Sequence, residues 1–322
     1  MNKSTRHASD KDATLANVAL LYYGEGLTQS DIAKRMQVSR ATIVNMLRES
    51  RERGIVEIRV DGHHLSSSNL AREIRDRFGL QDVYIAISDT SDTESERSDL
   101  LGQVGRVGAS AILDIIEPGD RLGVAWGETI MAVSNVTAQS STDQVEVCQL
   151  IGSMNSDRVP ASENCAIQIA GKLGAKCFTL HAPGIVATAE LAEVFRNEPT
   201  IKDQLARLDD LDMTIASIGN VLENTHLQAA GMATAQELNV AREMGAVGII
   251  CCRYIDRDGK NIETSPDERL LAATLSNLRK PKKKLLVVCG SDRAHATLAA
   301  IRGDLVTHLC VDQGLAKELL AL

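Results

Sequence analysis

The sequence lacks any apolar run that approaches the roughly 20 residues needed to cross a membrane. The N-terminal stretch MNKSTRHASDKDATL also lacks the apolar core of an export signal. With 322 residues, 44% of them hydrophobic and 24% charged, the chain is long enough for about two domains with sizeable cores. We therefore expect a cytoplasmic protein without a membrane partner.

The seven cysteines lack the spacing typical of metal-binding sites and lie mostly within apolar runs. No Cys-x-x-Cys pair occurs, so we expect no metal site and no cofactor, but reduced and buried thiols. A thiol sensor at the adjacent Cys251 and Cys252 is an alternative. Neighbouring cysteines rarely form a relaxed disulfide, and this pair follows Ile250 in an apolar segment, which favours burial.

Charge is distributed unevenly along the chain. The formal net charge of -8 by itself argues against nucleic-acid binding. Residues 34–59, however, contain seven lysines and arginines and three glutamates, a local charge of +4 that leaves -12 for the rest of the chain. A basic patch on an acidic chain is typical of a small DNA-binding domain joined to a larger soluble one.

Residues 28–53, TQSDIAKRMQVSRATIVNMLRESRER, have the spacing of a helix-turn-helix, whose second helix enters the major groove of DNA. Thr28 and Ser39 are placed to cap the two helices. Apolar residues at helical spacing over 13–23 predict a preceding helix. The alternation over 55–60 predicts a β-wing after the motif.

The second helix of the motif, expected over 40–53, has an apolar and a polar face. Ile43, Val44 and Leu47 lie at core spacing. Arginine pairs with guanine edges, asparagine with adenine, and a threonine methyl contacts thymine, whereas residues near the helix starts are better placed for phosphates. The expected DNA contacts are Thr28, Gln29, Lys34, Ser39, Arg40, Ala41, Thr42, Asn45 and Arg48. A helical hairpin used for protein contacts is the alternative interpretation.

Apolar strands alternate with helices through the rest of the chain. The expected strands are 83–87, 121–125, 145–150, 177–180, 213–217, 247–252, 285–289 and 305–311. The expected helices are 69–78, 100–116, 128–138, 162–173, 188–197, 201–208, 235–244, 267–278, 293–301 and 314–320. This alternation predicts an α/β domain with a mainly parallel sheet covered on both faces. Such sheets bind ligands at the carboxyl ends of their strands.

Three loops at expected strand ends combine glycine with groups that bind anions. GVAWGETI at 123–130 opens a helix whose free N–H groups suit a phosphate, although a plain connecting turn also fits. GAVG at 245–248 leads to Arg253, which fits either an anion contact or a structural ion pair. CGSDR at 289–293 places a cation just after a glycine. Together these loops favour an anionic small molecule, most simply a phosphate ester.

Residues 13–322 resemble the SorC/DeoR-type family of bacterial sugar-binding transcription regulators. The resemblance is carried by YYGEGLTQSDIA (22–33), by GVAWGETI (123–130), by GAVG (245–248) with RYIDRDG (253–259), and by CGSDRAHATLAAIRGDLVTHLCVDQGLA (289–316). It implies a winged helix-turn-helix and a Rossmann-like, doubly wound effector domain related to sugar-phosphate isomerases and deaminases. The expected domains are a disordered tail at 1–12, the DNA-binding domain at 13–60, a linker at 61–68, and an effector-binding and oligomerisation domain at 69–322.

The resemblance also implies an effector site. The implied residues are Gly127, Glu128 and Thr129 at the phosphate, Arg253 and Arg293 as cationic contacts, and Ser153, Asn155 and Asn164 beside the sugar. Three positions depart from the family pattern, with Ile249 in place of an aspartate, Cys289 in place of a glycine and Arg293 in place of a lysine. Arginine still holds phosphate, but the lost acceptor at Ile249 leaves open a differently hydroxylated or unphosphorylated effector.

The sequence thus predicts a DNA-binding transcriptional regulator of a carbohydrate catabolic operon, controlled by a small sugar, polyol or sugar phosphate. Double-stranded operator DNA, that effector and further copies of the chain, in a tetramer, are the expected partners. The alternative is a sugar-phosphate isomerase or deaminase with a DNA-binding head. It would need an acid–base pair, for which the candidates are Glu128, Asp292, His295 and Asp312. Shared fold does not imply shared function, and we expect no enzyme activity.

Overall fold

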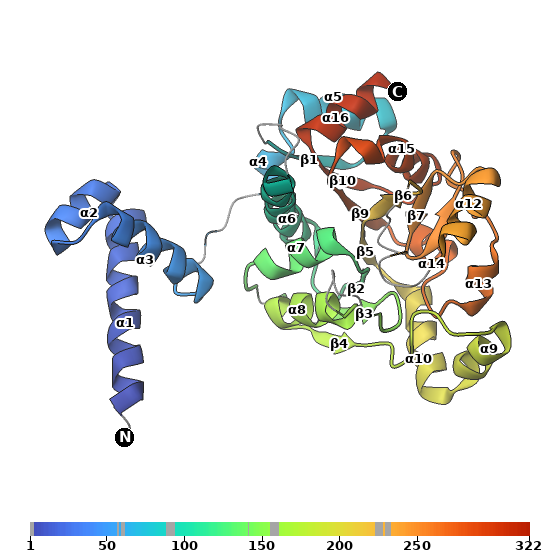
Figure 1. Cartoon of the computed structure of the whole chain (residues 1–322), viewed down its shortest axis with the longest axis horizontal. Helices are drawn as coiled ribbons and strands as arrows, with labels where there is room; N and C mark the ends of the chain where they lie inside the picture. The colour runs from blue at the N-terminus through green and yellow to red at the C-terminus, as the bar shows by residue number, and fades with distance from the viewer. Residues whose placement is uncertain are drawn as a thin grey trace. The chain divides into compact units, whose positions relative to one another are not determined.

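The computed structural model of the chain describes residues 3–56, 58, 62–87, 94–140, 142–154, 161–222, 228 and 233–322 (Figure 1). The chain divides into two compact units, Met1–Val60 and Asp61–Leu322. Each has its own hydrophobic core. Within the described residues, every helix is too short or too polar to cross a bilayer.

The N-terminal unit is helical. Its elements are α1 (Lys3–Ala19), the π-helical turn η1 (Leu20–Gly24), α2 (Gln29–Met36) and α3 (Arg40–Glu52). Where the sequence predicts a disordered tail, residues 3–12 are the first part of α1. Lys11 pairs with Glu49 of α3 and Asp12 with Arg53, the C-cap residue of α3, each at 2.6 Å. These two ion pairs tie α1 to the end of α3.

Local hydrogen bonds set the start of both helices of the motif, as the sequence predicts. The Thr28 hydroxyl accepts the Asp31 N–H at 3.2 Å, and the Ser39 hydroxyl accepts the Thr42 N–H at 3.0 Å. Between them Gln37 adopts a left-handed conformation, with φ 55°, and reverses the chain. The caps satisfy N–H groups that have no partner within the helix.

One expected core residue of α3 is on the surface instead. Ile43 and Leu47 are buried, but Val44 is 42% exposed, and Met46 packs partly buried against the core. The reason is the helical period: Ile43, Leu47 and Ser50 repeat at i, i+4 and i+7 on one stripe. Val44 lies beside that stripe, on the outward side of the helix.

The sequence predicts a β-wing at 55–60. Residues 55, 56 and 58, which the structure describes, form no strand. The N–H groups of Ile55 and Val56 donate to the carbonyl of Ser50, at 2.8 and 3.1 Å, which closes the end of α3 rather than forming a strand. Residues 57, 59 and 60 lie outside the described residues.

The C-terminal unit is built on a seven-stranded parallel sheet (Figure 1), which confirms the predicted α/β class. In spatial order the strands are β1 (Asp82–Ala86), β10 (His308–Asp312), β9 (Lys283–Val288), β5 (Met213–Ala216), β2 (Arg121–Val124), β3 (Glu146–Gln149) and β4 (Lys176–Phe178). All seven coincide closely with expected strands. Except in the edge strand β4, their central residues are buried, because helices cover a parallel sheet on both faces.

The helices follow the predicted alternation with the strands. They are α4 (Gly62–Leu65), α5 (Asn69–Phe78), α6 (Glu94–Ile115), α7 (Glu128–Val136), α8 (Glu163–Leu173), α9 (Ala189–Asn197), α10 (Pro199–Arg207), η2 (Leu208–Asp210), α12 (Ala235–Glu243), α13 (Ser265–Arg269), α14 (Leu275–Arg279), η3 (Ser291–Arg293), α15 (Ala294–Arg302) and α16 (Gln313–Ala321). Helix α4 falls in the expected linker. Helices α9 and α10 pack together at the end of the unit remote from α5 and α16 (Figure 1).

A second sheet, of three short antiparallel strands, is the main departure from the expected fold. It consists of β6 (Ile218–Asn220), β7 (Gly248–Ile250) and β8 (Arg253–Ile255). The segment 247–252, expected in the parallel sheet, is therefore the middle strand of this small sheet. Gly248 lets α15 approach closely, since a Cβ there would lie 2.9 Å from the Cβ of Ala296.

The helix expected over 267–278 is divided into α13 and α14. The intervening backbone bonds to other segments instead of continuing a helix: Leu271 N–H donates to the Gly184 carbonyl at 2.9 Å and Ala273 N–H to the Leu150 carbonyl at 2.7 Å. These partners are far away in the sequence, so local periodicity could not reveal them.

Candidate ligand pocket and nucleic-acid interface

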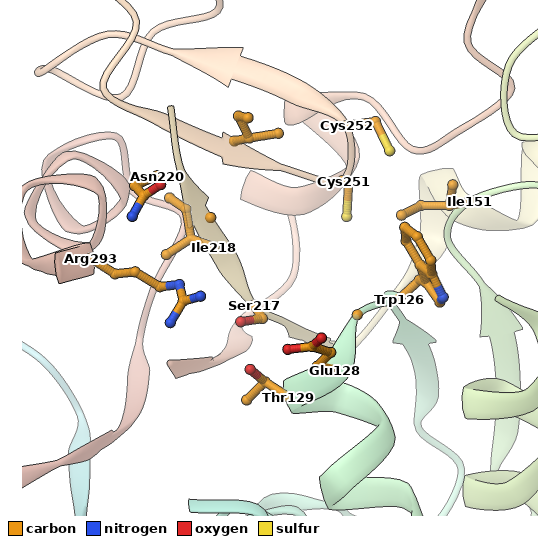
Figure 2. A pocket seen from close by; sticks show the side chains of 13 residues that line it. Trp126, Glu128, Thr129, Ile151, Ser217, Ile218, Asn220, Cys251, Cys252 and Arg293 are labelled. Carbon is orange, nitrogen blue, oxygen red and sulfur yellow. The ribbon is translucent and has the colours of Figure 1, made fainter. Parts of the chain in front are cut away.

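A pocket opens beyond the carboxyl ends of β2 and β5, where the first turn of α7 begins (Figure 2). The space between its walls measures about 620 Å³, part of which is open solvent. The lining residues are Trp126, Gly127, Glu128, Thr129, Ile151, Ser217, Ile218, Gly219, Asn220, Ile249, Cys251, Cys252 and Arg293.

The loop into α7 forms one side of the pocket. Gly127 has φ 140°, a conformation that residues with a side chain rarely adopt. It stands at the N-cap of α7, where no side-chain capping bond is made. Gly127, Glu128 and Thr129, the expected phosphate loop, all line the pocket. A helix start of this kind favours an anion.

Arg293 supplies a cation from the opposite side. Its side chain is 13% exposed and lies 3.8 Å from the Asp292 carboxylate, and its Nη1 donates to the Cys289 carbonyl. Figure 2 shows its guanidinium directed across the pocket toward Ser217 and Thr129. Gly290, with φ 102°, turns the chain here and donates its N–H to Asp312 at 2.7 Å.

Sequence reasoning missed the part of the pocket that follows β5. Ser217, Ile218, Gly219 and Asn220 all line it, and the Asn220 side-chain amide donates to the Asp292 carboxylate at 2.6 Å. One signal was available, because these residues follow the carboxyl end of a central strand, where open sheets bind ligands.

Three of the expected effector-binding residues, all described in the structure, do not line the pocket. Arg253 has a 12% exposed side chain that pairs with Asp267 at 3.0 Å and donates to the Ala273 carbonyl at 2.7 Å, the structural ion pair left open by the sequence. Ser153 is exposed and Asn164 half-buried, and neither lines the pocket. Asn155 lies outside the described residues.

Cys251 and Cys252 form the turn between β7 and β8 and line the pocket. Both are buried, 5% and 7% exposed, which confirms their predicted burial. Burial raises the pKa of Cys251 to about 12 and raises that of Cys252 further, so both are uncharged thiols. None of the seven cysteines, all of them among the described residues, forms a disulfide. The pair therefore contributes small, weakly polar groups rather than a reactive thiolate.

The N-terminal unit carries a continuous exposed face on α3. Arg40, Ala41, Val44, Asn45 and Arg48 repeat at i, i+1, i+4, i+5 and i+8, and all are exposed. The Arg40 Nε donates to the Gln29 side chain at 3.3 Å, which orients it across the two helices. This face combines arginine and asparagine donors with the apolar Val44.

The remaining expected DNA contacts lie at the two helix starts or along α2. Thr28 and Lys34 are exposed. The Ser39 hydroxyl is bound to the N–H and hydroxyl of Thr42, and Thr42 is half-buried. Ser39 therefore caps α3 in this structure.

Known proteins match both units of the chain. A family model described as "Putative sugar-binding domain" matches residues 63–321. The chain is 35% identical over 311 residues to "Uncharacterized transcriptional regulator YjhU" of Escherichia coli (strain K12). This match covers 96% of this chain and 95% of that relative. This chain belongs to the SorC/DeoR-type family of transcriptional regulators. The sorbitol operon regulator of Klebsiella pneumoniae is 26% identical over 318 residues, covering 97% of this chain and 99% of the regulator.

Solved structures of SorC/DeoR-type regulators share this fold. Full-length SorC, the sorbitol operon regulator of Klebsiella pneumoniae, superposes with a TM-score of 0.70 at 24% identity and covers 97% of this chain and 99% of its own. A probable sor operon regulator from Shigella flexneri gives 0.71 at 21% identity, over 78% of this chain and 98% of its own. The resemblance inferred from the sequence motifs is confirmed.

Proposed function

We propose that this regulator binds operator DNA of a carbohydrate operon and that a small sugar phosphate in the pocket controls this binding. One observation carries the proposal. The same chain presents an exposed arginine- and asparagine-bearing helix face in one unit and, in the other, a pocket with a cation and an uncapped helix start.

The exposed face of α3 supplies the base contacts in this proposal. Arg40 and Asn45 are suited to guanine and adenine edges, and Val44, between them on the helix surface, to a thymine methyl. Thr28 and Lys34 are placed for phosphates, which fix the position on DNA but not the sequence read. The segment 34–59, which contains α3, has a charge of +4, whereas the whole chain has a charge of -8. DNA should therefore bind to this face rather than to the acidic rest of the surface.

The pocket supplies groups for a phosphate and for hydroxyls. In this proposal the N–H groups at the start of α7, whose first residues line the pocket, and the Arg293 guanidinium hold the phosphate together. Among the described residues that line the pocket, Glu128 is the one carboxylate. Its carboxylate can accept hydrogen bonds from ligand hydroxyls, as can the Ser217 hydroxyl, while the Asn220 amide is held in place by Asp292.

We further propose that the protein is not an enzyme. Asp312 accepts the Gly290 N–H and, at 2.9 Å, the Leu315 N–H, and Asp292 holds Asn220. His295 is exposed and does not line the pocket. Of the four candidate acid–base groups, only Glu128 lines the pocket, whereas isomerase or deaminase chemistry needs a pair.

Control requires that the ligand bind two states of the protein with different affinity. We propose that these states are two arrangements of a homo-oligomer, a tetramer in the simplest case, that space its DNA-binding units differently. A regulator of this kind works in the cytoplasm, where the operator is. Size measurement of the full chain by light scattering, with and without ligand, tests the oligomer.

The direct test separates the two sites. An operator is first selected from genomic fragments, and its affinity for the full chain is measured by fluorescence anisotropy with and without sugar phosphates. Arg40→Ala and Asn45→Ala should weaken operator binding, while Arg293→Ala should keep it and lose the response to ligand. Unchanged operator affinity in both α3 variants would show that this face does not read DNA.

A further inference from the structure

Helix α6 contacts both the helix that starts at the pocket and the helix that follows the DNA-binding unit. Figure 1 shows α6 beside α7 and α4, and it packs against both. The pocket residues 127–129 form the start of α7, whereas α4 begins at the second residue of the C-terminal unit. The packing of α6 therefore joins the pocket to the segment that follows the DNA-binding unit.

The contact between α6 and α7 brings two helix backbones together. A Cβ on Gly105 of α6 would lie 2.9 Å from both the carbonyl carbon and the carbonyl oxygen of Ala132 in α7. A Cβ on Gly108, the next turn of α6, would lie 2.9 Å from the Val133 side chain. Glycine destabilises the interior of a helix relative to alanine, so the close approach explains why two buried glycines stand here. Ala132 follows the pocket residue Thr129 by less than one helical turn.

The contact between α6 and α4 also depends on a glycine. A Cβ on Gly62, the first residue of α4, would lie 3.0 Å from the Cβ of Asp114 and 3.1 Å from the carbonyl oxygen of Ser110, both in α6. The Asp114 carboxylate accepts a hydrogen bond from the Tyr84 hydroxyl at 2.7 Å, and Tyr84 is fully buried in β1. The start of α4 therefore packs on a part of α6 that is tied to the sheet.

Close backbone contacts are suited to transmit a displacement. A long side chain can absorb a small shift of its neighbour by changing rotamer, but two backbones in contact cannot. Packed interiors have low compressibility and transmit strain. Ser110 and Asp114 follow Gly105 by five and nine residues in one continuous helix, about 8–14 Å along its axis. A shift of α7 against α6 should therefore reach α4.

We propose that α6 couples the pocket to α4: a ligand that displaces the first turn of α7 displaces α6, and α6 displaces α4 and so changes operator affinity. The inference rests on the proposed function, because it requires a ligand in the pocket and an operator bound by α3. It adds the route between them. Gly105 and Gly62 are positioning residues on this route, and neither lines the pocket.

The coupling is measured on the full chain as the ratio of operator affinities with and without a saturating probe. Fluorescence anisotropy follows operator binding, and isothermal titration calorimetry follows probe binding. The probes are ribose 5-phosphate, glucose 6-phosphate, fructose 6-phosphate and sorbitol 6-phosphate. We expect at least one to bind and to change operator affinity by about 5- to 150-fold, and the one with the largest effect is used for the variants.

Gly105→Ala should uncouple the two sites, because its Cβ forces α6 away from Ala132. We expect this variant to bind the probe and the operator separately, while the ratio falls about 2- to 30-fold toward one. Gly102→Ala is the matched control on the same helix, since its Cβ would meet only the Arg106 guanidinium, at an ordinary 3.6 Å. It should keep the full ratio. Equal ratios in these two variants overturn the inference.

Gly62→Ala tests the same coupling from α4. It decides the question if Gly105→Ala fails to fold or to bind the probe, because a small displacement of α4 relieves its contacts with Ser110 and Asp114. This variant should bind the probe as the wild-type chain does and lose part of the ratio. A full ratio would show that α4 takes no part and would also overturn the inference.

Hydrogen exchange gives a readout that a purely structural role of Gly105 would not change. The Ser66 N–H donates to the Gly62 carbonyl at 3.3 Å and closes α4. Its exchange rate should respond to the probe in the wild-type chain and in Gly102→Ala, but less in Gly105→Ala. An exchange rate that the probe leaves unchanged in the wild-type chain contradicts a displacement of α4.

Two outcomes in the wild-type chain separate failure of this inference from failure of the proposed function. If a probe changes operator affinity and every glycine variant keeps the full ratio, only the route through α6 is wrong. If no probe binds, or if a probe binds without changing operator affinity, control by a sugar phosphate is wrong and the inference falls with it.

Discussion

At the scale of single residues, Arg253 and Arg293 illustrate how partners decide a role. Both side chains are almost buried, at 12% and 13% exposed. Arg253 makes three hydrogen bonds within the fold, to Asp267 and to the carbonyls of Ala272 and Ala273. Arg293 lines the pocket and reaches across it. Only Arg293 is therefore positioned to exchange a protein contact for a ligand.

Replacing Arg293 by alanine should remove most of the affinity for a sugar phosphate. Hydrogen bonds to a charged group contribute about 1.5–3 kcal/mol, so we expect affinity to fall about 10- to 150-fold, measured by calorimetry. Arg302→Ala, on the exposed surface of the following helix, is the control and should bind normally. Normal affinity in the Arg293 variant would remove this residue from the site.

His308 should make the C-terminal unit sensitive to acid. Burial in β10 lowers its pKa from 6.5, so the folded protein binds a proton less readily than the unfolded chain. The stabilisation is complete above about pH 6.5 and is lost as the pH falls through the folded pKa. In urea unfolding between pH 7 and 5, His308→Asn should flatten this decline, while the exposed His181→Asn should not. Equal slopes in both variants would contradict the role of His308.

At the scale of elements, Ser39 stabilises the start of α3 through its cap on Thr42. Ser39→Ala should destabilise the N-terminal unit by about 1 kcal/mol, measured as faster hydrogen exchange of α3 amides in the full chain. Ser30→Ala is the matched control, because Ser30 is exposed within α2, where alanine is the better helix former. A Ser39 variant that exchanges no faster than the Ser30 variant would contradict the cap.

The turn after β8 packs against the end of α15 through two glycines, Gly259 and Gly303. A Cβ on Gly303 would lie 2.8 Å from both the Cα and the carbonyl oxygen of Gly259. Gly303→Ala should therefore cost about 1–3 kcal/mol of stability through overpacking. Gly171→Ala, in open space on α8, should stabilise by about 0.5–1 kcal/mol. Urea unfolding measures both, and a neutral Gly303 variant would show that the junction relaxes.

At the scale of the whole molecule, the small DNA-binding unit must bind negatively charged DNA although the whole chain has a net charge of -8. The local charge of +4 provides few phosphate contacts, so we expect useful affinity to come from several DNA-binding units held in one oligomer. Linked binding of this kind gains about 10²- to 10⁴-fold. Residues 1–60 alone should bind the selected operator at least about 100-fold more weakly than the full chain, by anisotropy at equal salt. Equal affinities would contradict an oligomer that contributes to binding.

Local features of the chain were predictable from the sequence because they depend on residues close together. The caps at Thr28 and Ser39 join residues three apart, and the seven parallel strands are short apolar runs bounded by turns. The Gly127 loop was recognised for the same reason, since a strand, a glycine and a helix follow one another directly. The family, the α/β class and one side of the pocket were determined by the sequence itself.

The tertiary structure alone decided where nonlocal partners meet. The segment 247–252 reads as a strand in any sheet, and only its pairing with β6 and β8 placed it in the small one. That pairing brings Ile249, Cys251 and Cys252 to the pocket, while Arg253, the next residue, turns to Asp267. The pairing of β6 with β7 and the contact of Arg253 with Asp267 join residues distant in the chain, and neither periodicity nor spacing encodes such contacts.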